Sequence, residues 1–118
     1  MTIYKEYLSN VLIESVRSIF DEKLQTTAWK EGDYKMYADF PEVTMSFKED
    51  CEPVLNNYRK YGLSKQHRDN LLELYKMVDA YSLDSNRPST EAEILTDPRW
   101  NEIRKHAKKV YKELIALA

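Results

Sequence analysis

The sequence has little of what several protein classes need. Two glycines and four prolines among 118 residues exclude a collagen-like chain and argue against a turn-rich β-sandwich. A single cysteine allows no internal disulfide, so we expect the chain to mature in a reducing compartment. No apolar run approaches the roughly 20 residues that cross a bilayer, and the start of the chain, MTIYKEYLSN, lacks the regions of a signal peptide. We therefore expect a cytoplasmic protein.

The composition is typical of one globular domain. With 42% hydrophobic and 32% charged residues, the chain predicts a single domain over residues 1–118. Apolar residues recur at intervals of three and four, and no pair of strands joined by an Asn-Gly or Asp-Gly turn is present. These patterns predict an all-α fold, a single-domain bundle of four to five helices.

Local signals predict where the helices begin and end. The first apolar stripe predicts a helix from about Ile3 to Leu24 that fades at the following threonine pair. Later helices are expected to begin at Ser64, at Thr90, which forms a capping box with Glu93, and at the N-cap Asp97 followed by a proline. The helix after Ser64 is expected to run over Lys65–Ser82.

The segment between these helices is harder to interpret. A turn is expected at Gly32, and residues 34–40 fit a short helix or an extended segment equally well, ended by Pro41. Val43, Phe47 and Cys51 then follow helical spacing. Pro53 predicts either a kink or the start of a new helix that ends at Gly62.

Charge is distributed unevenly along the chain. Residues 31–52 carry seven acids against two lysines, a net charge of −5, whereas residues 99–112 carry six bases against one acid, a net charge of +5. Such asymmetry concerns partners and association rates rather than the fold.

Motifs for catalysis and for cofactor or metal binding are missing. The sequence has no glycine-rich phosphate loop, no H-E-x-x-H, no cysteine pair and no G-x-S-x-G. We expect His67 and His106 to be ordinary histidines near the solvent faces of separate helices, and Cys51 to be a small buried residue. We therefore expect no enzyme and neither a cofactor nor a bound metal.

The acidic middle of the chain contains the candidate binding residues. Trp29 and Phe40 are expected to belong to the core, whereas Tyr34 and Tyr37 fit a core or a partner contact equally well. Aromatic anchors among carboxylates are typical of a surface that binds a basic protein. The candidate partner-binding residues are Glu31, Asp33, Tyr34, Tyr37, Asp39 and Glu42, with Asp69, Glu73 and Asp79 of the helix over Lys65–Ser82.

Two stretches, WKEGDY at 29–34 and ILTDPRW at 94–100, resemble bacterial immunity proteins of contact-dependent growth-inhibition systems and their colicin-type relatives. The resemblance implies that the chain binds and blocks a cognate toxin domain, commonly a nuclease, encoded by a neighbouring gene. A nuclease holds phosphates with Lys and Arg, so a carboxylate-rich surface can compete for that site.

Two alternatives remain open at this point. One is a protein-interaction module, an adaptor or inhibitor, whose partner is not a toxin. The other is a small helical regulator that binds DNA through the basic run of the last helix, which contains Arg104, Lys105, Lys108 and Lys109. The net charge of −2 argues against nucleic acid, and the apolar helix faces are needed for a core rather than for a membrane surface.

Overall fold

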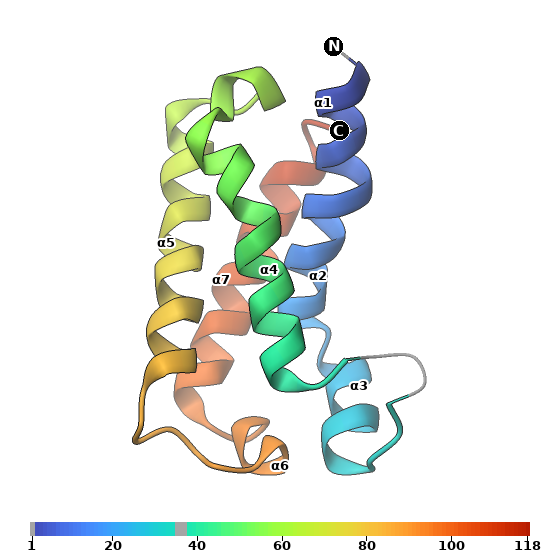
Figure 1. The fold of residues 1–118 in the computed structure, drawn as a ribbon, viewed down its shortest axis with the longest axis vertical. Helices are drawn as coiled ribbons and strands as arrows, with labels where there is room; N and C mark the ends of the chain where they lie inside the picture. The colour runs from blue at the N-terminus through green and yellow to red at the C-terminus, as the bar shows by residue number, and fades with distance from the viewer. Residues whose placement is uncertain (1, 35–37) are drawn as a thin grey trace.

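Four long helical segments form a bundle in the computed structural model, which describes residues 2–34 and 38–118 (Figure 1). The first segment joins α1 (Thr2–Tyr7), the π-helical turn η1 (Leu8–Leu12) and α2 (Ile13–Phe20); the others are α4 (Phe40–Asn56), α5 (Lys65–Leu83) and α7 (Pro98–Ile115). Shorter elements are α3 (Glu22–Gln25), the π-helical η2 (Thr26–Lys30), the 3-10 helix η3 (Tyr58–Tyr61) and α6 (Glu91–Ile94). No strand occurs among the described residues, so the all-α prediction is confirmed.

The bundle has two distinct ends. Helix α7 packs against α2 and α5, and α4 packs against the same two helices. The start of α1 and the end of α7 lie together at the upper end in Figure 1, whereas α3, η2, α6 and the start of α4 lie at the lower end. The largest fully buried side chains are Trp100, Phe40, Phe47, Leu8, Leu12, Ile19, Leu71, Leu74, Ile94 and Leu114. None of the described helices is long and apolar enough to span a membrane.

The first helix ends earlier than predicted. Its backbone breaks at Asp21, where ψ is 82°, and the Asp21 side chain caps the next helix by accepting from the Leu24 N–H. Residues 26–30, where we predicted a fading helix and a turn, are helical as well. Burial of Ala28 and Trp29 in the core explains the difference, because tertiary packing overrides the poor helix propensity of two threonines.

The prolines behave differently from the prediction. Pro41 was expected to end a segment, but it stands in the first turn of α4, where a missing N–H costs nothing, and Asp39 is the N-cap. Helix α4 continues through Pro53 to Asn56, so no new helix begins there. Buried Cys51 and Val54 on either side of Pro53 anchor that part of α4 in the core.

The other predicted helix boundaries agree with the structure. Ser64, Thr90 and Asp97 each cap a helix through the side chain. Gly62 has φ of 84°, in the left-handed region that favours glycine, and ends η3. These boundaries follow from short-range hydrogen bonds, which is why the sequence alone predicts them.

Candidate functional site

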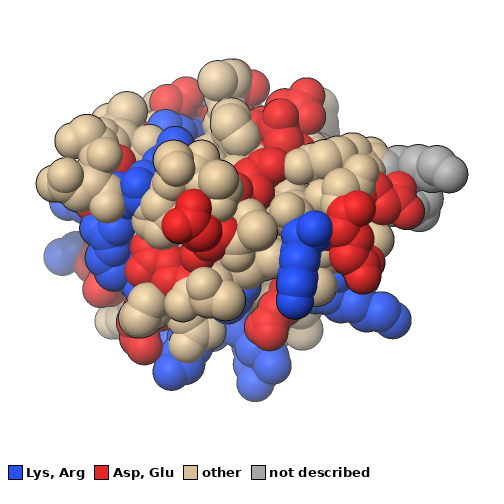
Figure 2. Space-filling view, turned by 90° about the horizontal axis from the view of Figure 1, so that it is seen from below, with Lys and Arg blue, Asp and Glu red and all other residues tan. Residues whose placement is uncertain are grey.

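Acidic side chains from three separate segments meet at the lower end of the bundle. Two follow η2, two begin α4 and two lie on α6. We call this set, with one tyrosine, the acidic end: Glu31, Asp33, Tyr34, Asp39, Glu42, Glu91 and Glu93. Figure 2 views the molecule from this side and shows acidic residues across the middle of the face, with Lys and Arg mostly around its edge.

Glu91 holds the acidic end together. Its carboxylate accepts one hydrogen bond from the Tyr34 hydroxyl and another from the backbone N–H of Phe40, at the start of α4. The hydrogen bond to Glu91 raises the pKa of Tyr34 to about 12, so the hydroxyl stays neutral at physiological pH. The Tyr34 side chain remains 46% exposed. The tyrosine is therefore both tethered and available to a partner.

A cluster of four aromatic rings lies behind the acidic end. Phe40 contacts Trp29, Tyr81 and Trp100 in edge-to-face geometry, with ring centroids 5.3–5.9 Å apart. Trp29 is 5% exposed and Phe40 2%, so the prediction that both belong to the core is confirmed. The Trp29 indole N–H donates to the carbonyl of Ala38 at 3.0 Å. This cluster gives the acidic end a rigid base.

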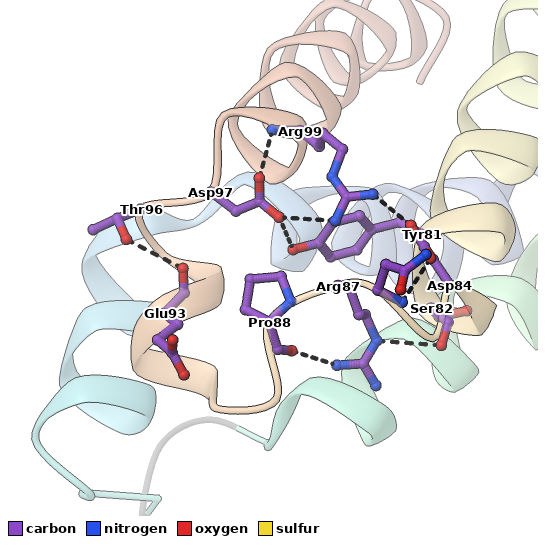
Figure 3. A network of polar contacts seen from close by, with 10 residues as sticks. Tyr81, Ser82, Asp84, Arg87, Pro88, Glu93, Thr96, Asp97 and Arg99 are labelled. Atoms are coloured by element: carbon purple, nitrogen blue, oxygen red, sulfur yellow. Dashed lines mark hydrogen bonds and ion pairs between the residues drawn. The ribbon is translucent and has the colours of Figure 1, made fainter.

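A pocket of about 510 Å³ opens between the start of α4 and α6. Asp39 and Glu91 line it together with one cation, Arg87. The Arg87 guanidinium lies 4.9 Å from the centroid of the Phe40 ring and donates to the backbone carbonyls of Ser82 and Pro88 (Figure 3). Two carboxylates and one fixed guanidinium leave the lining of the pocket net negative.

An ion-pair network joins α5 to the start of α7 (Figure 3). Arg99 pairs with Asp84 and with Asp97, and its guanidinium lies 5.2 Å from the centroid of the Tyr81 ring. The Tyr81 hydroxyl donates to Asp97 at 2.7 Å. The network fixes the loop that carries α6 at both of its ends.

The carboxyl groups of this network are more acidic than usual. Desolvation raises the pKa of Asp97. Hydrogen bonds from the Tyr81 hydroxyl and the Arg99 backbone N–H, together with the Arg99 charge, outweigh this effect and leave the pKa below its ordinary value. The pKa of Asp84 is lowered mainly by the N–H of Asn86 and then by the Arg99 guanidinium. Both groups therefore favour the charged form in the folded state.

This network predicts a loss of stability in acid. Because the folded pKa of Asp97 lies below its unfolded value, its contribution is complete above about pH 4 and is lost as the pH falls through the folded pKa. Asp97→Asn keeps a competent N-cap, so the variant should be less stable at pH 7 and lose less stability between pH 5 and pH 3. Urea unfolding at a series of pH values measures this; parallel pH curves for variant and wild type would contradict it.

The three predicted acids of α5 do not join the acidic end. Asp79 accepts from Lys48 of α4 at 3.0 Å, whereas Glu73 lies 4.0 Å from a ring nitrogen of His106 on α7. Asp69 lies in the second turn of α5, toward the opposite end of the bundle. The three carboxylates thus occupy separate positions along and around one helix.

Tyr37, another candidate binding residue, lies outside the described residues. The structure adds three residues to the candidate site that were not selected from the sequence. Glu91 and Arg87 line the pocket, and Glu93 was recognised only as part of a capping box. The sequence signal for Glu91 and Glu93 was two acids in the first turn of a helix capped by Thr90. Such a pattern indicates a helix N-terminus and does not by itself indicate a binding site.

Two basic residues lie in places that we did not expect. His106 is half-buried against α5, with its Nε2 3.2 Å from the carbonyl of Asn70, so the prediction of a solvent-facing histidine is wrong there. Arg104 is 8% exposed and donates to the carbonyl of Leu95 and the side chain of Gln25. Arg104 therefore faces these oxygens in the interior and is not part of the exposed basic face of α7.

The remaining reactive side chains are placed for structure. His67 accepts from the Ser64 N–H and completes the cap of α5. Cys51 is fully buried, as expected, and desolvation raises the pKa of its thiol well above the ordinary value. Across residues 2–34 and 38–118, no three His, Cys, Asp or Glu side chains are grouped to hold a metal ion.

No family model, curated protein or solved structure matches this chain.

Proposed function

We propose that this protein is an immunity protein, a cytoplasmic binder without enzymatic activity that neutralises a cognate toxin domain through the acidic end. The observation that carries the proposal is that three segments bring six carboxylates to the lower end of the bundle, where one of them, Glu91, bonds to the exposed Tyr34. A nuclease domain, whose phosphate site is built from Lys and Arg, is the partner that this chemistry fits.

The arrangement suits a fast and specific inhibitor. Carboxylates on one face attract a basic partner and raise the association rate, while a tyrosine supplies contact area that loses water on binding. The bonds of Glu91 to Tyr34 and to the start of α4 fix that surface before the partner arrives. A surface fixed in advance lowers the entropy cost of binding.

The DNA-binding alternative is less favoured by the same geometry. It would use α7, where the Arg104 guanidinium is largely buried and already bonded to the Gln25 side chain and the Leu95 carbonyl. The exposed lysines of α7 would instead repel a basic toxin domain, which directs such a partner to the acidic end.

The test is to sequence the neighbouring genes and express the compact, basic C-terminal domain that one of them is expected to encode. We expect this protein to bind that toxin domain with a dissociation constant on the order of 10 nM or tighter, typical of specific interfaces. We also expect it to restore the growth of cells that express the toxin domain. A non-cognate basic protein of similar charge serves as the control at physiological salt. Absence of both binding and protection would reject the immunity function in favour of an interaction module with a different partner.

A further inference from the structure

A shallow apolar groove of about 360 Å³ runs between the end of α5 and the start of α7. Met77 and Tyr81 of α5 and Ile103 of α7 line it, and Tyr81 and Ile103 are almost fully buried beneath it. Ala80, an exposed residue with a single methyl group, also lines the groove and leaves it open. Its volume lies within the range of ligand pockets, about 300–1,000 Å³.

The charges around this groove favour a cation beside an apolar group. Asp84, Glu102 and Arg99 line it, but Arg99 is already paired with Asp84 and with Asp97. Within the part of the chain that the structure describes, the Glu102 carboxylate has one polar contact, to Lys105 at 3.4 Å, and both side chains are about two-thirds exposed. An exposed pair of this kind contributes little, so Glu102 can accept a second cation at small cost.

The groove also adjoins the acidic end. The segment between α5 and α7 carries Asp84 at the groove and α6 with Glu93 at the acidic end, and Figure 3 shows both residues within one region. A partner seated on the acidic end therefore has the groove within reach.

We propose that the groove between α5 and α7 receives an aliphatic side chain of the partner, with a neighbouring Lys or Arg placed against Glu102. The occupant is a segment of the same basic toxin domain, so this inference rests on the proposed function. The aliphatic group covers Met77 and Ala80 at the mouth of the groove, while the cation meets the Glu102 carboxylate at its edge.

A small probe tests the groove without the toxin. The peptide acetyl-Leu-Lys-amide, titrated into the full-length protein, should give saturable NMR shifts of the Met77, Ala80 and Ile103 methyl groups, with a dissociation constant on the order of 1 mM. Acetyl-Leu-Glu-amide and acetyl-Ala-Lys-amide should each bind at least fivefold more weakly. Equal shifts with all three peptides, or no saturable shift with the first, would overturn the proposal.

Two matched variants extend the test to the complex. Ala80→Gln fills the groove without adding charge, and Ala116→Gln makes the same change at an exposed position at the upper end. We expect Ala80→Gln to abolish the peptide shifts and to weaken toxin binding at least tenfold, with Ala116→Gln unchanged in both. If Ala80→Gln binds the toxin normally while charge reversal at the acidic end abolishes binding, the groove is not part of the interface and the immunity function stands.

Discussion

Replacing Gln25 by alanine is expected to lower the free energy of unfolding by roughly 3–4 kcal/mol. Gln25 is completely buried, and its amide nitrogen donates to the carbonyls of Ser18 and Ile19 at the end of α2. Its amide oxygen accepts from the Trp100 indole and from the Arg104 guanidinium. Alanine leaves donors and acceptors without partners in the core, one of them on a charged group, and also creates a cavity.

Urea unfolding of wild type and variant measures this loss. The chain's other glutamine, Gln66, is exposed, and its one side-chain bond among the described residues goes to Asn70 on the same helix, so Gln66→Ala should change stability by less than about 0.5 kcal/mol. In the double variant Gln25→Leu with Arg104→Leu, the loss of unfolding free energy should be smaller than the sum of the losses in the two single variants. Removing both side chains of the pair leaves no unpaired buried charge. Additive losses would show that the two side chains do not act as a unit.

Reversing charge at the acidic end is expected to slow association with the toxin domain by more than tenfold at low salt, the range of electrostatic steering. Glu31→Lys with Glu42→Lys is the appropriate pair, because Asp39 caps α4 and the Glu93 carboxylate bonds to Thr90, the cap of α6, so their loss would confuse binding with folding. The effect should shrink as salt rises, since a Debye length of about 8 Å at 0.15 M screens exposed charges. Stopped-flow kinetics over a range of ionic strength measure it.

The matched control makes the same charge reversal at positions away from the acidic end. Glu6→Lys with Glu49→Lys changes the net charge by the same amount at exposed positions on α1 and in the middle of α4. This pair should alter the association rate far less than the variant at the acidic end. Equal slowing by both pairs would mean that total charge, rather than the acidic end, governs the encounter.

Sequence reasoning succeeded where the determinants are local. Ser64, Thr90 and Asp97 each satisfy an N–H group two or three residues away, so the caps are visible without tertiary structure. It failed at the break at Asp21 and at residues 26–30, which are helical. That helix depends on burial of Ala28 and Trp29, and Gln25 just before it bonds to Trp100 of α7, 75 positions away in the chain. No local pattern records such a contact.

The candidate site shows the same division. The acids Glu31, Asp33, Asp39 and Glu42 lie close together in the sequence, so their grouping was evident from charge alone. Glu91 completes the site from 51 positions beyond Phe40 and could not be assigned to it by spacing. Arg104 illustrates the opposite error, because a charged residue on a basic helix is normally solvated, whereas its bonds to the Gln25 side chain and the Leu95 carbonyl explain its inward position.

The placement of the chain ends has a practical consequence for every assay above. The beginning of α1 and the end of α7 lie at one end of a molecule 41 Å long, and the acidic end lies at the other. A fluorophore, an affinity handle or a sensor surface attached through either terminus would thus face away from the proposed contact. The proximity of the two ends also makes the fold a suitable insert within a loop of a carrier protein, or a substrate for circular permutation, with the carboxylate face left uncovered.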